Sequence, residues 1–149
     1  MSLVTGSCSA EVEFPVERCW ALVSDIERAP RWQRTLERVD VVERDERGRP
    51  LICDPLIDAK LAKVHCRVRM SYDEPVAVRW TLTESDDLDA MDGGWELEPL
   101  AAARTGVTYS LAVDPGGTGF VARRLESVLR PLMIGHQTDE LAQALESGL

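Results

Sequence analysis

Hydrophobic and polar residues alternate along most of this chain, so that every second side chain is apolar. The longest such stretch covers residues 62–72, and this period of two is typical of a strand with one buried face. Shorter stretches with this alternation occupy residues 8–14, 76–83, 91–98 and 107–113, and residues 36–44 and 51–57 are also expected to be strands. The seven segments predict an antiparallel sheet that is covered on one side only. Residues 99–105 are expected to form a loop between the last two strands.

Two parts of the chain have helical periodicity instead. Apolar residues within 16–23 recur at the spacing of one helix face, and Pro30 limits how far this helix can extend. A second short helix or turn then brings Trp32 inward. Near the end of the chain, residues 120–145 predict a long amphipathic helix, bent at Pro131 because proline removes an internal hydrogen bond.

The order of these elements predicts the fold class. One strand, two short helices, six strands and a long C-terminal helix make an α+β helix-grip fold, in which a seven-stranded antiparallel sheet curls around the last helix. Neither a repeat nor a linker interrupts the 149 residues, so 1–149 is expected to be a single domain. A curled sheet closed by a helix leaves room between them for a small molecule.

Local sequences within this order resemble a known family. Residues 16–32 place an Asp-Ile-Glu turn, a proline and a tryptophan after the first helix, and residues 94–99 and 105–109 are similar to the family's late strands. Over essentially its whole length the chain resembles the polyketide cyclase/dehydrase branch of the START and birch-allergen-like (SRPBCC) superfamily. The resemblance implies a fold with an internal cavity. It does not imply a reaction, because the branch includes ligand carriers as well as cyclases.

Charge and composition narrow the range of partners. With 17 basic and 26 acidic residues the formal net charge is −9, which disfavours nucleic acid and anionic membrane surfaces as partners. No stretch has the roughly 20 apolar residues of a membrane span, and the N-terminus lacks the pattern of a signal peptide. We therefore expect a cytoplasmic protein without an integral membrane part. Whether it is a monomer or a homodimer stays open.

The cysteine pattern indicates no special chemistry. Cys8, Cys19, Cys53 and Cys66 form no Cys-x-x-Cys pair, and no histidine stands at metal-ligand spacing from them. Their positions in apolar patterns predict four reduced, buried thiols. Neither a metal site nor a cofactor is expected.

Candidate site residues are the large side chains that the patterns turn inward. The predicted ligand-binding residues are Trp32, Met70, Tyr72, Trp80, Met91, Trp95, Tyr109, Leu125, Leu129, Leu132 and His136. Only the two tyrosines and the histidine among them are polar. Tyr72 and Tyr109 could donate to a ligand carbonyl, and the spacing of His136 from the preceding leucines places it on the buried helix face. These three are the candidate catalytic residues, since a cyclase needs groups that move protons.

The largely apolar inner faces favour binding over catalysis. The first hypothesis is therefore binding or transport of a hydrophobic small molecule, such as a lipid, isoprenoid, quinone or polyketide-like compound, without a reaction. The alternative is a polyketide aromatase/cyclase or dehydratase that uses the tyrosines and the histidine. A further alternative is a protein-interaction module that pairs with its partner through Leu141 and Leu145.

Overall fold

The computed structural model describes residues 3–58, 63–116 and 136–149. Its elements, in chain order, are β1 (Val4–Val12), α1 (Val16–Val23), the 3-10 helix η1 (Ile26–Arg31), β2 (Leu36–Arg44), β3 (Pro50–Asp58), β4 (Lys63–His65), β5 (Arg67–Asp73), β6 (Ala77–Glu84), β7 (Ala90–Ala101), β8 (Arg104–Asp114) and α3 (Gln137–Glu146). The predicted succession of one strand, two short helices and a run of strands is confirmed.

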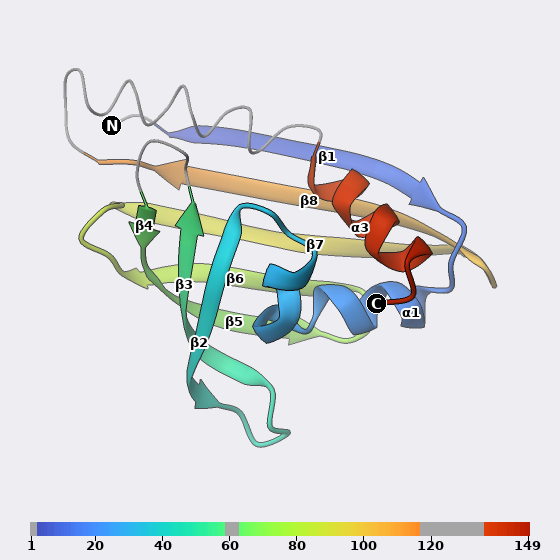
Figure 1. The fold of residues 1–149 in the computed structure, drawn as a ribbon, viewed down its shortest axis with the longest axis horizontal. Coiled ribbons are helices and arrows are strands. Elements are labelled where there is room, and N and C mark those ends of the chain that lie inside the picture. The colour runs from blue at the N-terminus through green and yellow to red at the C-terminus, as the bar shows by residue number, and fades with distance from the viewer. Residues whose placement is uncertain (1–2, 59–62, 117–135) are drawn as a thin grey trace.

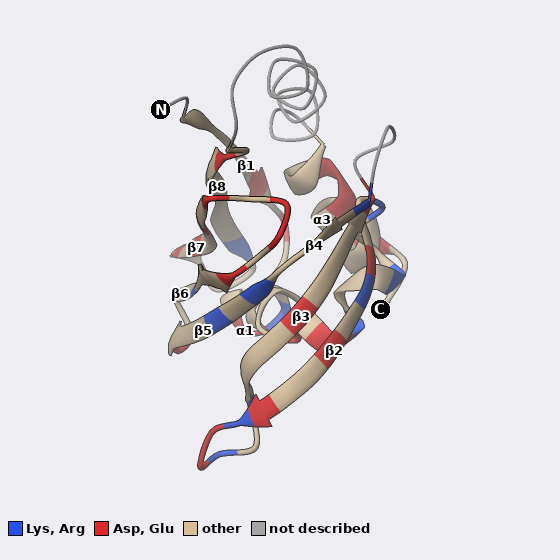
Figure 2. Ribbon diagram, turned by 90° about the vertical axis from the view of Figure 1, so that its left-hand side faces the viewer, with Lys and Arg blue, Asp and Glu red and all other residues tan. Residues whose placement is uncertain are grey.

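The strands of the described residues form one antiparallel sheet of eight strands. Their order is β1-β8-β7-β6-β5-β3-β2, and β4 pairs with β3 beside this path. The sheet curls, so that β2 and β3 run across the direction of β1, β8 and β7 (Figure 1). Seen from the side, α3 lies between the β1–β8 end and the β2–β3 end of the sheet (Figure 2). This arrangement is an α+β helix-grip-like fold.

The first helix packs an apolar face onto the sheet. Cys19, Trp20 and Val23 are buried, and they are spaced as one face of α1. Glu17 lies in the first turn, where negative charge suits the helix dipole. The Trp20 indole Nε1 donates to a carboxylate oxygen of Glu74 at 3.2 Å, which satisfies the polar atom of an otherwise buried ring.

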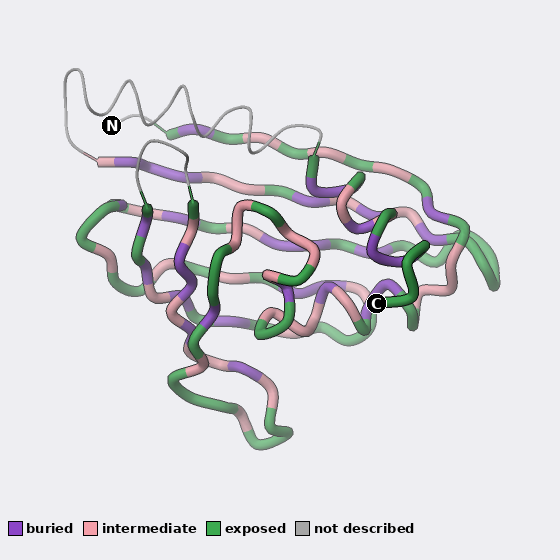
Figure 3. Tube along the Cα trace, viewed as in Figure 1, coloured by how far each residue is buried: buried purple, intermediate pink, exposed green. Residues whose placement is uncertain are grey.

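Burial along the strands follows the alternation in the sequence. More buried and more exposed positions alternate along β1, β5 and most of β8 (Figure 3). The buried positions meet in one core, and its most enclosed large side chains include Val68, Val78, Trp95 and Val107. Cys19, Cys53 and Cys66 are buried in this core as predicted, whereas Cys8 is half-buried, and none of the four forms a disulfide. Burial raises the pKa of the Cys53 thiol to about 11.

The stretch 62–72 does not form the single long strand that its alternation predicts. β4 ends at His65 and β5 begins at Arg67, so the sheet has eight strands rather than seven. The register between β3 and these two strands places Pro55 opposite Cys66. Because proline has no N–H to donate, the ladder is interrupted there. The thiol of Cys66 lies 3.8 Å from the carbonyl oxygen of Pro55 instead.

The predicted loop over 99–105 is wrong, since β7 and β8 continue through most of it. Pro99 pairs with Thr105, and only residues 102–103 make the turn. Thr105 is fully buried, and its hydroxyl donates to the carbonyl oxygen of Phe14 at 2.8 Å. This bond ties the start of β8 to the segment between β1 and α1.

The last helix begins later than a continuous helix over 120–145 would require. α3 starts at Gln137, and the backbone N–H of Glu140 donates to the carbonyl oxygen of His136 at 2.9 Å. His136 is therefore the N-cap residue, and the helix does not run unbroken through it. The part of the predicted helix within 117–135 lies outside the described residues.

Leu141 and Leu145 are buried in the protein's own core, at 0% and 1% exposure. They pack α3 onto β1, β8 and α1. The guanidinium of Arg18 also donates to the carbonyl oxygen of Leu145 at 3.1 Å, which joins the end of α3 to α1. The prediction that these leucines face a protein partner is therefore wrong.

Charged residues of both signs are interspersed along the strands and the β2–β3 turn (Figure 2). Two close pairs join neighbouring strands. Arg67 on β5 holds Asp54 on β3 through two bonds of 2.7 and 2.9 Å, and Arg79 on β6 holds Glu96 on β7 at 2.9 Å. Ion pairs therefore connect adjacent strands on the polar side of the sheet.

Candidate ligand-binding cavity

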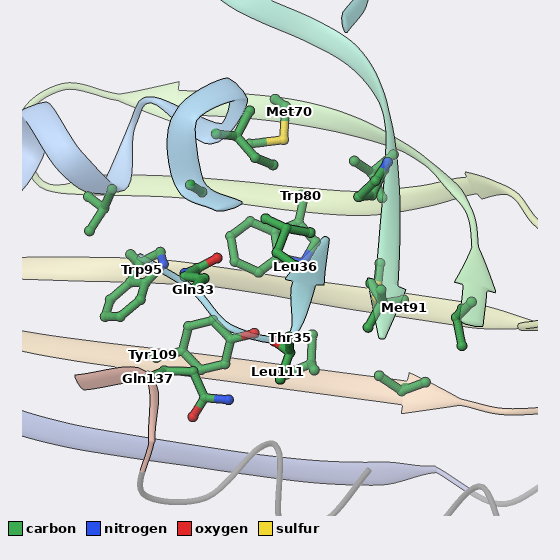
Figure 4. Close-up of a pocket in the computed structure, with 18 of the residues that line it drawn as sticks. Gln33, Thr35, Leu36, Met70, Trp80, Met91, Trp95, Tyr109, Leu111 and Gln137 are labelled. Carbon is green, nitrogen blue, oxygen red and sulfur yellow. The ribbon is translucent and has the colours of Figure 1, made fainter. Parts of the chain in front are cut away.

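A cavity of about 100 Å³ lies between the inner face of the sheet and the helices. Its lining comes from α1, η1, α3 and every strand from β2 to β8 (Figure 4). Most of the lining side chains are aliphatic or aromatic. The polar members among the described residues are Gln33, Thr35, Tyr109 and Gln137.

Four aromatic side chains follow one another through this cavity. Trp95 is 1% exposed, and its ring centroid lies 5.0 Å from that of Tyr109 and 5.9 Å from that of Trp32. The ring centroid of Trp80 also lies 5.9 Å from that of Tyr109. Tilted and edge-on contacts of this kind stabilise the cluster, and the rings offer flat apolar surface to a ligand.

The position of Trp80 depends on a glycine in the neighbouring strand. Trp80 pairs with Gly93 across β6 and β7, and Gly93 pairs in turn with Leu111 on β8. A Cβ atom on Gly93 would lie 2.6 Å from the indole Nε1 and 2.8 Å from a methyl carbon of Leu111. The missing side chain therefore lets the indole lie against β7, in the middle of the cavity (Figure 4).

Polar side chains gather at one end of the cavity. In the view of Figure 4, Thr35 is drawn next to the hydroxyl group of Tyr109, with Gln33 above and Gln137 below its ring. Tyr109 is 9% exposed, and its hydroxyl has no hydrogen-bond partner among the described residues. Gln137 is 6% exposed, and its Oε1 accepts from the thiol of Cys8 at 3.8 Å. A ligand oxygen at this end would meet the hydroxyl and the free amide N–H groups.

The same end is held together by a contact between α3 and the segment that connects η1 to β2. The backbone N–H of Arg34 donates to a carboxylate oxygen of Glu140 at 3.0 Å. Gln33 and Thr35, which line the cavity, stand on either side of this donor. The contact therefore keeps α3 next to the segment that carries these two polar side chains.

The electrostatic character of the cavity is neutral. Among its described lining residues there is no Asp, Glu, Lys, Arg or His. Burial raises the pKa of Tyr109, so this phenol stays protonated at neutral pH. Tyr109 can therefore donate a hydrogen bond but is a poor base.

The structure brings together six of the predicted ligand-binding residues. Trp32, Met70, Trp80, Met91, Trp95 and Tyr109 line the cavity. Tyr72 does not, because its hydroxyl donates to the carbonyl oxygen of Pro50 at 2.6 Å and its ring lies under the guanidinium of Arg49. His136 is exposed, so its predicted place on a buried helix face is wrong. Leu125, Leu129 and Leu132 lie outside the described residues.

The sequence did not indicate three of the polar lining residues. Gln33 and Thr35 belong to the short connection between η1 and β2. A connection of this kind has no hydrophobic periodicity from which the burial of a side chain could be predicted. Gln137 became a candidate only when the start of α3 placed it beside Cys8. The one signal that could have found it is the acidic pair two and three residues later, which is typical of a first helical turn.

Two kinds of feature are absent from the described residues. They contain no group of three or more His, Cys, Asp or Glu side chains that could hold a metal ion. Of the helices that the structure describes, none is long and apolar enough to cross a membrane.

The chain belongs to the family described as polyketide cyclase/dehydrase and lipid transport, whose pattern matches residues 12–135. The resemblance noted in the sequence is thereby confirmed. That family description covers both lipid transport and cyclase or dehydrase activity and does not separate them. None of the curated proteins matches the sequence of this chain.

Solved structures share the fold over nearly the whole chain. A START superfamily protein from Mycobacterium smegmatis is 19% identical, with a TM-score of 0.79 over 96% of this chain and 97% of the other. The Zhui aromatase/cyclase from Streptomyces sp. R1128 is 15% identical, with a TM-score of 0.79 over 98% and 93%. The protein TTHA0849 from Thermus thermophilus is 21% identical, with a TM-score of 0.76 over 96% and 94%. At these identities the likeness shows the fold alone.

Proposed function

We propose that this protein binds a hydrophobic small molecule in the cavity and carries or sequesters it without catalysing a reaction. The observation that supports this best is the lining, which is apolar and contains a run of four aromatic rings. Such a surface gains free energy from burying an apolar, ring-containing ligand.

The size of the cavity adds a condition to this proposal. About 100 Å³ is less than the roughly 300–1,000 Å³ of pockets that hold drug-sized ligands. Binding therefore requires lining side chains to move. Met70 and Met91 are suited to this, since unbranched thioether side chains adapt their shape at low cost.

The first experiment is native mass spectrometry of the freshly purified protein, followed by extraction with organic solvent. We expect a co-purified apolar compound in stoichiometric amount, which the extraction would identify. If none is present, titration with 2-acetylnaphthalene, a small apolar ketone, is the second measurement. Failure to detect either a co-purified compound or binding of this ketone would contradict the proposal.

A pair of variants on one strand connects binding to the cavity. Leu111 faces the cavity, whereas the adjacent Ser110 is exposed on the other side of β8. Leu111→Phe fills part of a small cavity and should weaken binding by about tenfold, which corresponds to about 1.4 kcal/mol. Ser110→Phe adds a ring of the same size outside the cavity and should leave binding unchanged. Equal effects of the two variants would place the ligand elsewhere.

A polyketide aromatase/cyclase or dehydratase is the second candidate function. It is favoured by the family description and by the likeness to the Zhui aromatase/cyclase, and Tyr109 could orient a ketone in the cavity. The carrier function is preferred because the raised pKa of Tyr109 makes it a poor base at neutral pH, and its described neighbours in the lining supply no carboxylate or imidazole.

A further inference from the structure

We infer that the polar end of the cavity is a recognition site for one neutral carbonyl oxygen of the ligand, with the Tyr109 hydroxyl and the Gln137 amide N–H as its two donors. The inference rests on the proposed function and adds to it the chemical class of the ligand: an apolar ring body that bears an uncharged ketone-type oxygen.

The first argument is that the hydroxyl of Tyr109 lines the cavity and bonds to no described residue. Only 9% of Tyr109 is exposed, its ring is held between Trp80 and Trp95, and its hydroxyl has no hydrogen-bond partner in the part of the chain that the structure describes. No fully enclosed side-chain nitrogen or oxygen of the described residues lacks a partner. The hydroxyl of Tyr72 is used within the protein, because it donates to the carbonyl oxygen of Pro50 at 2.6 Å. The hydroxyl of Tyr109 lines the cavity instead, where a ligand acceptor can reach it.

The second argument is the orientation of Gln137. Its Oε1 lies 3.8 Å from the thiol of Cys8, which is on β1, directly opposite Tyr109 in the sheet. The thiol is a weak donor, and it occupies the acceptor end of the amide. The two N–H groups of Nε2 have no partner among the described residues. The amide therefore has donors left for a ligand, beside the hydroxyl of Tyr109 (Figure 4).

The third argument concerns charge. A carboxylate on the ligand would lose its hydration in the cavity, and the described lining has no Lys, Arg or His to compensate for that loss. A neutral carbonyl costs less to bury and can accept from both donors, since its oxygen has two lone pairs. A pure hydrocarbon would leave both donors unpaired. The arrangement therefore selects a ketone over an acid and over a hydrocarbon.

The test uses three probes that share one ring body. These are 2-acetylnaphthalene, its carbon analogue 2-isopropylnaphthalene, and 2-naphthoate, and the dissociation constants are measured by calorimetry at pH 7. Two neutral hydrogen bonds should make the wild-type protein bind the ketone about tenfold more tightly than the carbon analogue. Naphthoate should bind more weakly than the ketone.

Variants then assign the preference to its donors. Tyr109→Phe and Gln137→Met each remove one donor and keep the apolar bulk, so each should reduce the tenfold preference to about threefold or less. Tyr72→Phe is the matched control, because its hydroxyl bonds to Pro50 outside the cavity, and it should leave the preference unchanged. The measured quantity is the ratio of the affinities for the ketone and for the carbon analogue. A destabilised variant that binds both ligands more weakly by the same factor leaves this ratio unchanged. If Gln137→Met does not fold, Tyr109→Phe alone decides.

The outcomes separate this inference from the proposed function. Equal wild-type affinity for the ketone and the carbon analogue would overturn the inference and leave the cavity function in place. So would tighter binding of naphthoate, or a ketone preference that Tyr109→Phe does not change. If the wild-type protein binds none of the three probes and carries no co-purified compound, the proposed function fails and the inference fails with it.

Discussion

A single missing Cβ atom determines the shape of the cavity. Gly93 on β7 pairs with Trp80 on β6, and the absence of a side chain there allows the indole to reach Tyr109. The aromatic run, and with it the flat surface offered to a ligand, depends on that close approach. Glycine is required here by contact with a neighbour and not by an unusual backbone angle.

Substitution of this glycine should therefore destabilise the protein. In Gly93→Ala the new Cβ overlaps the Trp80 indole at 2.6 Å, so the ring must move. We expect the free energy of unfolding, measured by urea denaturation, to fall by about 1–3 kcal/mol. Gly106→Ala on β8 is the control, because its Cβ would have no neighbour closer than 3.7 Å. Equal stability of the two variants would contradict this account of Gly93.

The two tyrosines show how far the sequence defines a residue's role. Both occur at inward positions of alternating strands, and the pattern predicts the same function for them. Their positions along the strands differ, since Tyr72 lies near the end of β5, where the carbonyl of Pro50 is within reach. Tyr109 lies in the middle of β8 among other aromatic rings. Only the three-dimensional neighbours distinguish a bonded hydroxyl from a free one.

At the scale of elements, an ion pair joins β3 to β5 beside the interruption at Pro55. The two hydrogen bonds from Arg67 lower the pKa of Asp54, although both side chains are more than a third exposed. The folded state therefore holds a proton on Asp54 less readily than the unfolded state does. The resulting stabilisation is present above the unfolded pKa of about 3.9 and is lost as the pH falls through the lower folded pKa.

Asp54→Asn should remove the pH-dependent stabilisation that the ion pair with Arg67 provides. At pH 7 we expect the variant to be less stable than the wild-type protein by at most about 1 kcal/mol, because solvent screens an exposed pair. The difference should shrink between about pH 4 and pH 2 in urea denaturation curves. Asp86→Asn is the control, since Asp86 is exposed and has no ion pair in the described parts of the chain. A difference that persists undiminished at pH 2 would show that the pair has another role.

The contact between Glu140 and the backbone of Arg34 should slow ligand release. It holds α3 against the segment that carries Gln33 and Thr35, so a ligand leaving by this end must break it. Glu140→Ala should raise the dissociation rate of 2-acetylnaphthalene by about three- to tenfold in stopped-flow measurements, as loss of one hydrogen bond predicts.

Two further variants test whether that hydrogen bond is responsible. Glu140→Gln keeps a carbonyl oxygen as acceptor and should restore most of the slow release. Glu146→Ala changes an exposed residue at the far end of the same helix and should have no effect. Unchanged release from Glu140→Ala would mean that the ligand leaves by another route.

At the scale of the whole molecule, the curled sheet separates two surfaces with different chemistry. One side is laced by ion pairs such as Arg79–Glu96, and the other lines a neutral cavity. The chain belongs to the polyketide cyclase/dehydrase and lipid transport family, and solved structures that are 15–21% identical share its fold. If the proposed function holds, the few polar side chains at the end of the cavity select its ligand.

The sequence by itself determined the order of most strands, the short first helix, the family, and the tryptophan and methionine residues of the lining. It could do so because alternation records which side of its own strand each residue occupies. The tertiary structure alone decided the break opposite Pro55, the exposure of His136 and the polar end of the cavity. Those features depend on contacts between residues that are distant in the sequence, such as Cys8 with Gln137 or Arg34 with Glu140. Local hydrophobic periodicity contains no information about such contacts.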